Sequence, residues 1–369
     1  MYYTSKLFRK KDIYNHTKYE SLFFKAIKEN CLYLYKRCSD YKKLLDDKSF
    51  DISTDLKSID DINKIPFIPT LYLKRHKLTT IKHKALITVT SSGTSGKNRS
   101  EIDFNFGFLL RAWNMTRKVA KYHKLWSIKP TRYLILGYKP NKKNPAAVTK
   151  TAFAATFFAP GVSRTYAIDY INGEYKVDLD KLKNKLIKFA KGRLPVRTMG
   201  FPAYTYFLLK QMKEEGIKVK LPKGSKIMLG GGWKQFYAEK VDKIDFYKLA
   251  EEVLGINDKN IVEFFGAVEH PILYTDCREH HFHIPIYSKI IIRDVSTLEP
   301  LKEGQVGLIN LITPISSSSP LISIMTDDLG VLHSSCKCGE EGQYLEIIGR
   351  VGIKDIITCA QGAEEILKQ

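Results

Sequence analysis

The sequence predicts an α/β protein with a small β-rich subdomain, and three observations carry this prediction. The chain has 369 residues, of which 44% are hydrophobic and 12% aromatic, enough for a large packed core. Short apolar runs typical of strands alternate with amphipathic stretches typical of helices. Over residues 284–348 the apolar runs become shorter and are separated by Gly and Pro, which indicates the β-rich subdomain.

The individual elements follow from periodicity and from helix-breaking residues. Residues 18–48 carry apolar side chains at helical spacing, and Cys31 and Cys38 within them are expected to be small buried hydrophobes. Residues 65–70 contain two prolines and are therefore not regular helix. The Lys-rich residues 139–150 are expected to form an exposed loop. Strand-like runs occupy 85–90, 133–136, 226–229, 261–265 and 290–293, with a helical pattern at 177–190.

The charge balance is strongly basic, with 60 Lys and Arg against 39 Asp and Glu and a net charge of +21. The basic residues are scattered along the chain, and no zinc-finger, RNP or helix-turn-helix pattern accompanies them. A solvated basic surface is therefore favoured over nucleic-acid binding, and attraction to an acidic protein is the next possibility. The polar start, the shortness of the most apolar stretch and the six cysteines lead us to expect a cytoplasmic protein without membrane span or disulfide scaffold.

A hydroxyl-rich loop follows the strand-like run at 85–90. Five hydroxyl side chains surround two glycines, and a lysine closes the loop. Small residues let backbone N–H groups approach an anion, hydroxyls add donors, and the ammonium supplies charge. The spacing differs from that of a Walker A loop, and the alternative is a flexible polar turn. We expect phosphate contact from Ser91, Ser92, Gly93, Thr94, Ser95, Gly96 and Lys97.

Four further motifs follow this loop in order: Gly230-Gly231-Gly232-Trp-Lys, Phe264-Phe265-Gly266-Ala-Val-Glu269, Thr326-Asp-Asp328-Leu-Gly330 and Gly349-Arg350. With the loop, they resemble the adenylate-forming (acyl-CoA synthetase-like) superfamily over about residues 60–360. More narrowly the chain resembles the acyl-protein synthetases of bacterial bioluminescence operons, with phenylacetate-CoA ligases as cousins. Two positions depart from the superfamily pattern, because Val268 stands in place of Thr and Asp327 in place of Gly.

The resemblance implies that ATP activates a carboxylic acid, a reaction that brings two anions together and requires charge neutralisation and Mg²⁺. Lys97 then supplies a catalytic ammonium, and Glu269 is a suitable hard ligand for Mg²⁺. The glycines Gly230, Gly231 and Gly232 flank the adenine, while Phe265, followed by Gly266, offers it a flat face. Asp328 and Arg350 contact the ribose. Each residue taken alone has a purely structural alternative: Phe265 as a core residue, Glu269 and Asp328 as surface acids, and Arg350 as a salt-bridge partner.

Only 19 residues follow Arg350, too few for the mobile C-terminal lid domain of acyl-CoA ligases. We therefore expect a synthetase body over residues 1–345 and a hinge remnant with an acyl-accepting tail over 346–369. Thr358 and Gln361 have capping-box spacing, which places Cys359 in the first turn of a short helix, where a thiolate is stabilised. The resemblance implies that Cys359 accepts the acyl group; the alternative is a buried apolar cysteine.

A possible zinc site is formed by Cys277, one of three nearby histidines, and the pair Cys336 and Cys338. The three histidines are His280, His281 and His283. His283 is the preferred nitrogen ligand because it leads into the strand-like run at Ile284, and His281 is the reserve. Related phenylacetate-CoA ligases show a similar arrangement.

The leading hypothesis is an ATP-dependent acyl-protein synthetase that activates a fatty acid as acyl-AMP and transfers it to Cys359. An acyl-CoA reductase-type or acyltransferase protein would then receive the acyl group. One alternative is an acyl- or aryl-CoA ligase of the phenylacetate-CoA ligase type. Another is a basic nucleotide- or RNA-binding protein without catalysis.

Overall fold

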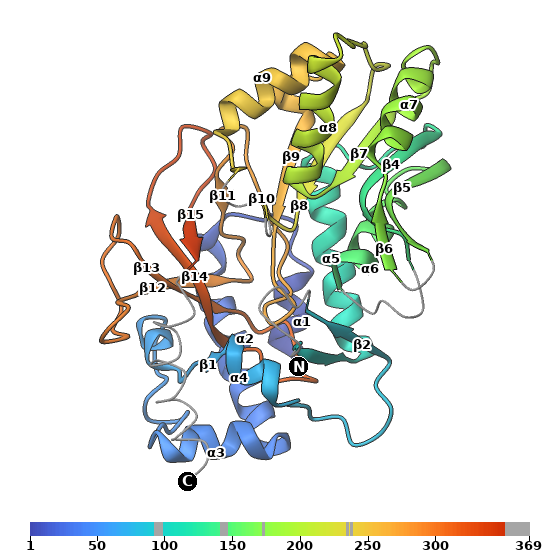
Figure 1. Cartoon of the computed structure of the whole chain (residues 1–369). Helices are drawn as coiled ribbons and strands as arrows, with labels where there is room; N and C mark the ends of the chain where they lie inside the picture. Colours follow the sequence, from blue (N-terminus) through green and yellow to red (C-terminus); the bar gives the residue numbers. More distant parts are fainter. Residues whose placement is uncertain (92–98, 141–146, 172–173, 234–235, 237–238, 351–369) are drawn as a thin grey trace. The chain divides into compact units, whose positions relative to one another are not determined.

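The computed structural model describes residues 1–91, 99–140, 147–171, 174–233, 236 and 239–350 (Figure 1). The chain divides into two compact units. Unit 1 comprises Met1–Lys118 and Gly266–Gln369, and unit 2 comprises Val119–Phe265. The helix α5 (Phe106–Tyr122) begins in unit 1 and ends in unit 2.

Unit 2 is built on a mostly parallel sheet with the strand order β9-β8-β7-β4-β5-β6. The pairs from β9 to β5 are parallel, whereas β6 pairs antiparallel with β5 at the edge. The strands are β4 (Thr131–Tyr138), β5 (Gly161–Ile171), β6 (Glu174–Val177), β7 (Val196–Gly200), β8 (Lys226–Gly230) and β9 (Ile261–Phe265). The connecting helices are α6 (Ala147–Ala155), α7 (Leu179–Ala190), α8 (Pro202–Glu214) and α9 (Lys243–Leu254).

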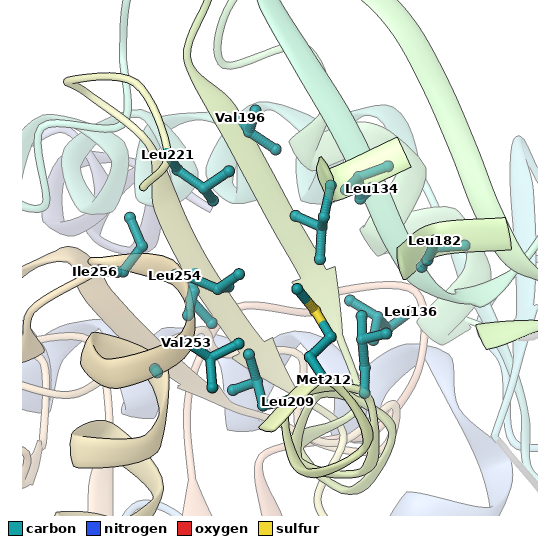
Figure 2. Close-up of a cluster of buried hydrophobic side chains, with 14 of the residues drawn as sticks. Leu134, Leu136, Leu182, Val196, Leu209, Met212, Leu221, Val253, Leu254 and Ile256 are labelled. Atoms are coloured by element: carbon teal, nitrogen blue, oxygen red, sulfur yellow. The ribbon is translucent and has the colours of Figure 1, made fainter. Parts of the chain in front are cut away.

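Successive side chains of the parallel strands enter two different cores, one on each face of the sheet. Leu134 and Leu136 of β4 pack in one cluster, which also contains Leu209 of α8 and Val253 of α9 (Figure 2). The alternate residues Tyr133 and Ile135 belong to a second cluster, with Met228 of β8 and Val262 of β9. This alternation explains why the strands read as continuous apolar runs, because a parallel sheet is buried on both faces.

The first core predicts a large loss of stability when a central side chain is shortened. Leu209 is fully buried on α8 among the side chains of Figure 2. Leu209→Ala is expected to lower the free energy of unfolding by about 2–5 kcal/mol, because it removes transfer energy and leaves a cavity. Urea unfolding followed by circular dichroism measures this, with exposed Lys210→Ala on the same helix expected within about 0.5 kcal/mol of wild type. Equal effects of the two substitutions would contradict the packing.

Unit 1 contains an antiparallel sheet with the order β11-β15-β14-β13-β12, and β1 pairs parallel with β14. A separate hairpin joins β2 and β3. The strands are β1 (Ile68–Pro69), β2 (Ile87–Thr90), β3 (Glu101–Phe104), β10 (Tyr274–Thr275), β11 (Phe282–His283), β12 (Lys289–Arg293), β13 (Gly307–Ile312), β14 (Ser323–His333) and β15 (Tyr344–Arg350). The helices are α1 (Tyr2–Phe8), α2 (His16–Arg37), α3 (Ser39–Asp47) and α4 (Thr70–Arg75), besides the start of α5.

The α/β class predicted from the sequence is confirmed, and Cys31 and Cys38 are buried as expected. The helical pattern at 18–48 is confirmed and is divided into two helices, because Cys38 is extended, with φ −120° and ψ 107°, between α2 and α3. One local prediction needs correction. The loop predicted at 139–150 is wrong at its end, since α6 begins at Ala147, where Ala and Thr replace the Lys and Pro residues. Among the described helices, none combines the length and apolar character that a membrane span requires.

Candidate active site and metal centre

The hydroxyl-rich loop is carried by the hairpin β2–β3 of unit 1. Thr90 pairs with Glu101 at the open end of the ladder, and the Ser91 N–H donates to the Ser100 carbonyl at 3.0 Å. The Ser91 hydroxyl oxygen accepts from the Ser100 N–H, also at 3.0 Å, so this hydroxyl closes the stem. Ser92, Gly93, Thr94, Ser95, Gly96 and Lys97 lie outside the described residues.

A buried carboxylate holds the stem of this hairpin in place. Asp103 of β3 is 4% exposed and accepts a 2.7 Å hydrogen bond from the Thr88 hydroxyl. Lys77 approaches the same carboxylate at 3.0 Å. The two strands are thereby tied by side chains as well as by their ladder, and the loop between them begins and ends on a fixed base.

In unit 2, the glycine-rich and aromatic motifs lie at the carboxyl ends of neighbouring parallel strands. Gly230 ends β8 opposite Phe264 of β9, and Phe265 is the last residue of β9. Gly231 and Gly232 have φ values of 86° and 67°, a left-handed conformation that glycine adopts without strain. Ligands of α/β sheets bind at the carboxyl ends of the strands, so this edge fits a nucleotide base.

In unit 1, the two residues expected at the ribose occupy opposite positions of one strand pair. Asp328 of β14 and Arg350 of β15 are Cα partners in the antiparallel ladder. The preceding Asp327 accepts a 2.8 Å hydrogen bond from the Thr70 hydroxyl, and Lys74 lies 3.4 Å from its second oxygen. The superfamily's Gly is thus replaced by a carboxylate that ties β14 to the start of α4.

Glu269, the expected Mg²⁺ ligand, is 5% exposed in unit 1. None of the described residues donates a hydrogen bond to its carboxylate or forms an ion pair with it. A carboxylate with little exposure and no ion-pair partner among the described residues is a suitable ligand for a divalent cation. The nearby Gly266 is required by close packing, because a Cβ there would lie 2.8 Å from the Ile272 carbonyl oxygen.

The metal-ligand candidates converge in unit 1. Cys277 follows β10, His283 ends β11, and Cys336 and Cys338 lie in the loop between β14 and β15. Their ligand atoms all lie within 4.8 Å of one another, with 3.8 Å between the sulfurs of Cys277 and Cys336. Ligands about 2.3 Å from a tetrahedral zinc ion have sulfur–sulfur edges of about 3.8 Å. Three sulfurs and one imidazole nitrogen therefore fit zinc in kind and spacing.

Backbone N–H groups point at all three sulfurs of this cluster. Glu279 approaches Cys277 at 3.3 Å, Cys338 approaches Cys336 at 3.5 Å, and Glu340 approaches Cys338 at 3.4 Å. Hydrogen bonds to a sulfur favour its thiolate, which is the form that binds a metal. The backbone of the loops around the cysteines therefore stabilises the thiolate form of each sulfur.

The surroundings of His283 favour the neutral imidazole, which is the form that binds a metal. Burial lowers its pKa to about 4, so the ring carries no charge at neutral pH. Its Nε2 lies 3.1 Å from the Cys338 sulfur. In the metal-free protein, burial raises the pKa of Cys277 and of Cys338, and metal binding must therefore release protons.

The reserve ligand His281 takes a supporting position that the sequence pattern did not indicate. Its Nδ1 lies 3.2 Å from the Cys336 sulfur, while its ring stacks on Tyr344 at 4.2 Å. His333 stacks on Tyr344 as well, at 4.7 Å, and bonds Glu346 at 2.9 Å. His280 bonds Asp276 at 2.9 Å instead of joining the cluster. Cys359 lies outside the described residues.

Several known proteins are similar to this chain over most of its length. Two curated relatives are long-chain-fatty-acid–luciferin-component ligases, from Aliivibrio fischeri (25% identical, 94% of this chain and 88% of the relative covered) and from Vibrio harveyi (24%, 82% and 78%). A phenylacetate-coenzyme A ligase of Thermus thermophilus is 24% identical over 87% of this chain and 68% of its own.

Among solved structures, 2-hydroxyisobutyryl-CoA ligase in complex with 2-HIB-AMP has a TM-score of 0.69 at 14% identity, covering 92% of this chain and 70% of that chain. This likeness shows a shared adenylate-forming ligase fold. The family described as "Acyl-protein synthetase, LuxE" matches residues 12–368, nearly the whole sequence. The chain therefore belongs to the acyl-protein synthetase (LuxE) family.

Proposed function

We propose that the protein couples a long-chain fatty acid to AMP and then transfers the acyl group to its own Cys359. The family match over residues 12–368 carries this proposal, and the names of the luciferin-component ligase relatives support the fatty acid. The protein is an ATP-dependent ligase of the adenylate-forming type. In the first step a carboxylate oxygen attacks the α-phosphorus of ATP and pyrophosphate leaves.

The roles proposed for the site residues follow from their chemistry. The hydroxyl-rich loop, with Ser91 to Lys97, binds the phosphates, and Asp328 with Arg350 binds the ribose. Gly230 to Gly232 and Phe265 with Gly266 surround the adenine. Glu269 would hold Mg²⁺, which neutralises phosphate charge when bound. Glu269 is 5% exposed and forms no ion pair with any described residue, which supports that role.

The cysteine inventory supports Cys359 as the acyl acceptor. The chain has six cysteines, and the structure describes five. Cys31 and Cys38 are buried, and burial raises the pKa of Cys31 to about 12, so neither offers an accessible thiolate. The other three belong to the cluster with His283. The Cys359 thiolate attacks the acyl carbon, a thioester forms, and AMP leaves.

We further propose that an acyl-CoA reductase-type or acyltransferase protein receives the acyl group.

We also propose that Cys277, His283, Cys336 and Cys338 hold a structural zinc ion. Four protein ligands leave no open position for a substrate, which is typical of a structural site. These four residues would hold the ion between the loop after β10 and the loop between β14 and β15.

Glu269→Gln provides the test of the adenylation step. The substitution keeps the size of the side chain and removes its charge, so Mg²⁺ and the phosphates are held more weakly. ATP–pyrophosphate exchange with tetradecanoate is expected to fall by about 100-fold or more. The matched control is Glu303→Gln, an exposed carboxylate of the same unit, which is expected to keep wild-type exchange.

Exchange that survives in Glu269→Gln would contradict the role of that carboxylate. Wild-type protein that shows no exchange with any fatty acid would contradict the proposed function. Acyl-CoA made in multiple turnovers by the purified chain, without protein-bound acyl groups, would assign the activity to a CoA ligase.

A further inference from the structure

A cluster of basic side chains lies in unit 2 at the amino ends of the parallel strands. Arg197 is the second residue of β7 and is paired in register with Lys226, the first residue of β8. Arg197 donates to the Tyr133 hydroxyl at 3.4 Å, which places it on the face of the second core. Gly230, by contrast, ends β8, so the cluster lies at the opposite strand ends from the motif proposed to bind adenine.

The end of α5 brings two more basic residues to this cluster. The Leu125 N–H donates to the Ala120 carbonyl and the Lys124 N–H to the Lys121 carbonyl, the pattern of a Schellman cap. His123 and Lys124 are the residues that turn the chain. Lys124 has a φ of 51°, in the left-handed region where glycine is usual, so the turn keeps a lysine against its backbone preference.

The four basic residues, His123, Lys124, Arg197 and Lys226, form what we call the basic cluster. Burial, followed by the charges of Arg197 and Lys124, lowers the pKa of Lys226. Burial and the charge of Lys226 lower the pKa of His123 to about 4. Lys226 therefore lies near enough to the other three residues for their charges to act on one another. Arg197 is buried and Lys226 is half-buried, so water screens this pair incompletely, whereas Lys124 is exposed.

None of the described carboxylates forms an ion pair with Arg197 or with Lys226. Arg197 is 3% exposed, and its Nε has no described hydrogen-bond partner. The Nε2 of His123 is likewise buried without one. Lys226 reaches a neutral oxygen, that of Asn260, at 3.4 Å. Glu263 of the adjacent strand points to the other face and pairs with Lys243 at 2.6 Å.

We infer that the basic cluster binds a small phosphate-class oxyanion, at a site separate from the proposed ATP site. Buried cations and N–H donors without partners are costly, and an oxyanion offers both the charge and the acceptors that they lack. The Nε of Arg197 and the Nζ of Lys226 would donate to its oxygens. His123 would take up a proton on binding, because an adjacent anion favours its charged form. Free phosphate, pyrophosphate and the phosphate of a nucleotide share this chemistry.

Calorimetric titration of the full chain with inorganic phosphate and with pyrophosphate, at matched ionic strength, tests the inference. Lys226→Gln is expected to weaken binding at least tenfold, and Lys226→Arg to restore most of it. Lys223→Gln is the matched control, because Lys223 is exposed three residues away and carries the same charge. A Lys97→Gln background removes the ammonium of the hydroxyl-rich loop, and binding at the basic cluster is expected to persist in it.

A second readout uses the His123 ring. Adding saturating phosphate to the wild-type protein is expected to raise the NMR-detected pKa of His123 by about one unit or more. The same phosphate concentration is expected to cause no such rise in Lys226→Gln. Equal phosphate binding by Lys226→Gln and Lys223→Gln would overturn the inference, as would binding that disappears with Lys97→Gln alone. Titration with AMP separates the sources: AMP binding weakened by Lys226→Gln identifies a nucleotide phosphate, and AMP binding unchanged by it identifies the free anion.

Discussion

Cys359→Ala is expected to abolish acyl labelling of the protein while leaving acyl-AMP formation at the wild-type rate. The proposed adenylation step uses the hydroxyl-rich loop, Glu269 and Asp328, none of which the substitution changes. Transfer requires a thiolate, and alanine offers no nucleophile. Incubation with radiolabelled tetradecanoate, ATP and Mg²⁺, followed by denaturing electrophoresis, measures the label. Hydroxylamine sensitivity identifies it as a thioester.

The matched control for this experiment is Cys38→Ala. Cys38 is 2% exposed, and burial raises its pKa, so it does not compete as a nucleophile. We expect full labelling in this variant. Hydroxylamine-sensitive label that persists on Cys359→Ala would show that another thiol carries the acyl group. Loss of ATP–pyrophosphate exchange in Cys359→Ala would show that the residue acts earlier, in adenylation or in folding.

The parts of the fold that the sequence predicted are those in which burial is nearly complete. β4, β8 and β9 are covered on both faces, so their side chains are apolar at successive positions and stand out as runs. β6 lies at the sheet edge and is exposed at every position, and its neighbour β5 mixes exposed with buried positions, so neither gives such a run. The break at Cys38 escaped prediction because a single extended residue does not disturb the apolar spacing of α2 and α3.

For the candidate site, sequence motifs identified residues but not their partners. Cys-x-Cys spacing names two sulfurs, yet the support of Cys336 by His281 depends on a contact across 55 residues. The replacement of Gly by Asp327 could be read in the sequence, whereas its contacts with Thr70 and Lys74 depend on the pairing of β1 with β14. The basic cluster joins α5, β7 and β8, and no local pattern marks it.

Removal of the proposed zinc ion is expected to cause the second large effect. Cys277→Ser should lower the zinc content from about one ion per chain to near zero and the free energy of unfolding by about 3 kcal/mol or more, because the binding free energy of the ion no longer stabilises the folded state. Elemental analysis and thermal unfolding measure the two quantities. His280→Asn is the matched control: it alters a neighbouring histidine outside the cluster, and asparagine tolerates the left-handed φ of 58° at this position.

The affinity for zinc should also fall as the pH is lowered. Because burial raises the pKa of Cys277 and of Cys338 in the metal-free protein, zinc must displace their protons, and a higher proton concentration opposes binding. Competition with a chromophoric chelator between pH 8 and pH 6 measures this as a progressive loss of affinity. The zinc site would be contradicted if wild-type protein contains no zinc after purification and unfolds at the same temperature as Cys277→Ser. The four side chains would then pack together without a metal.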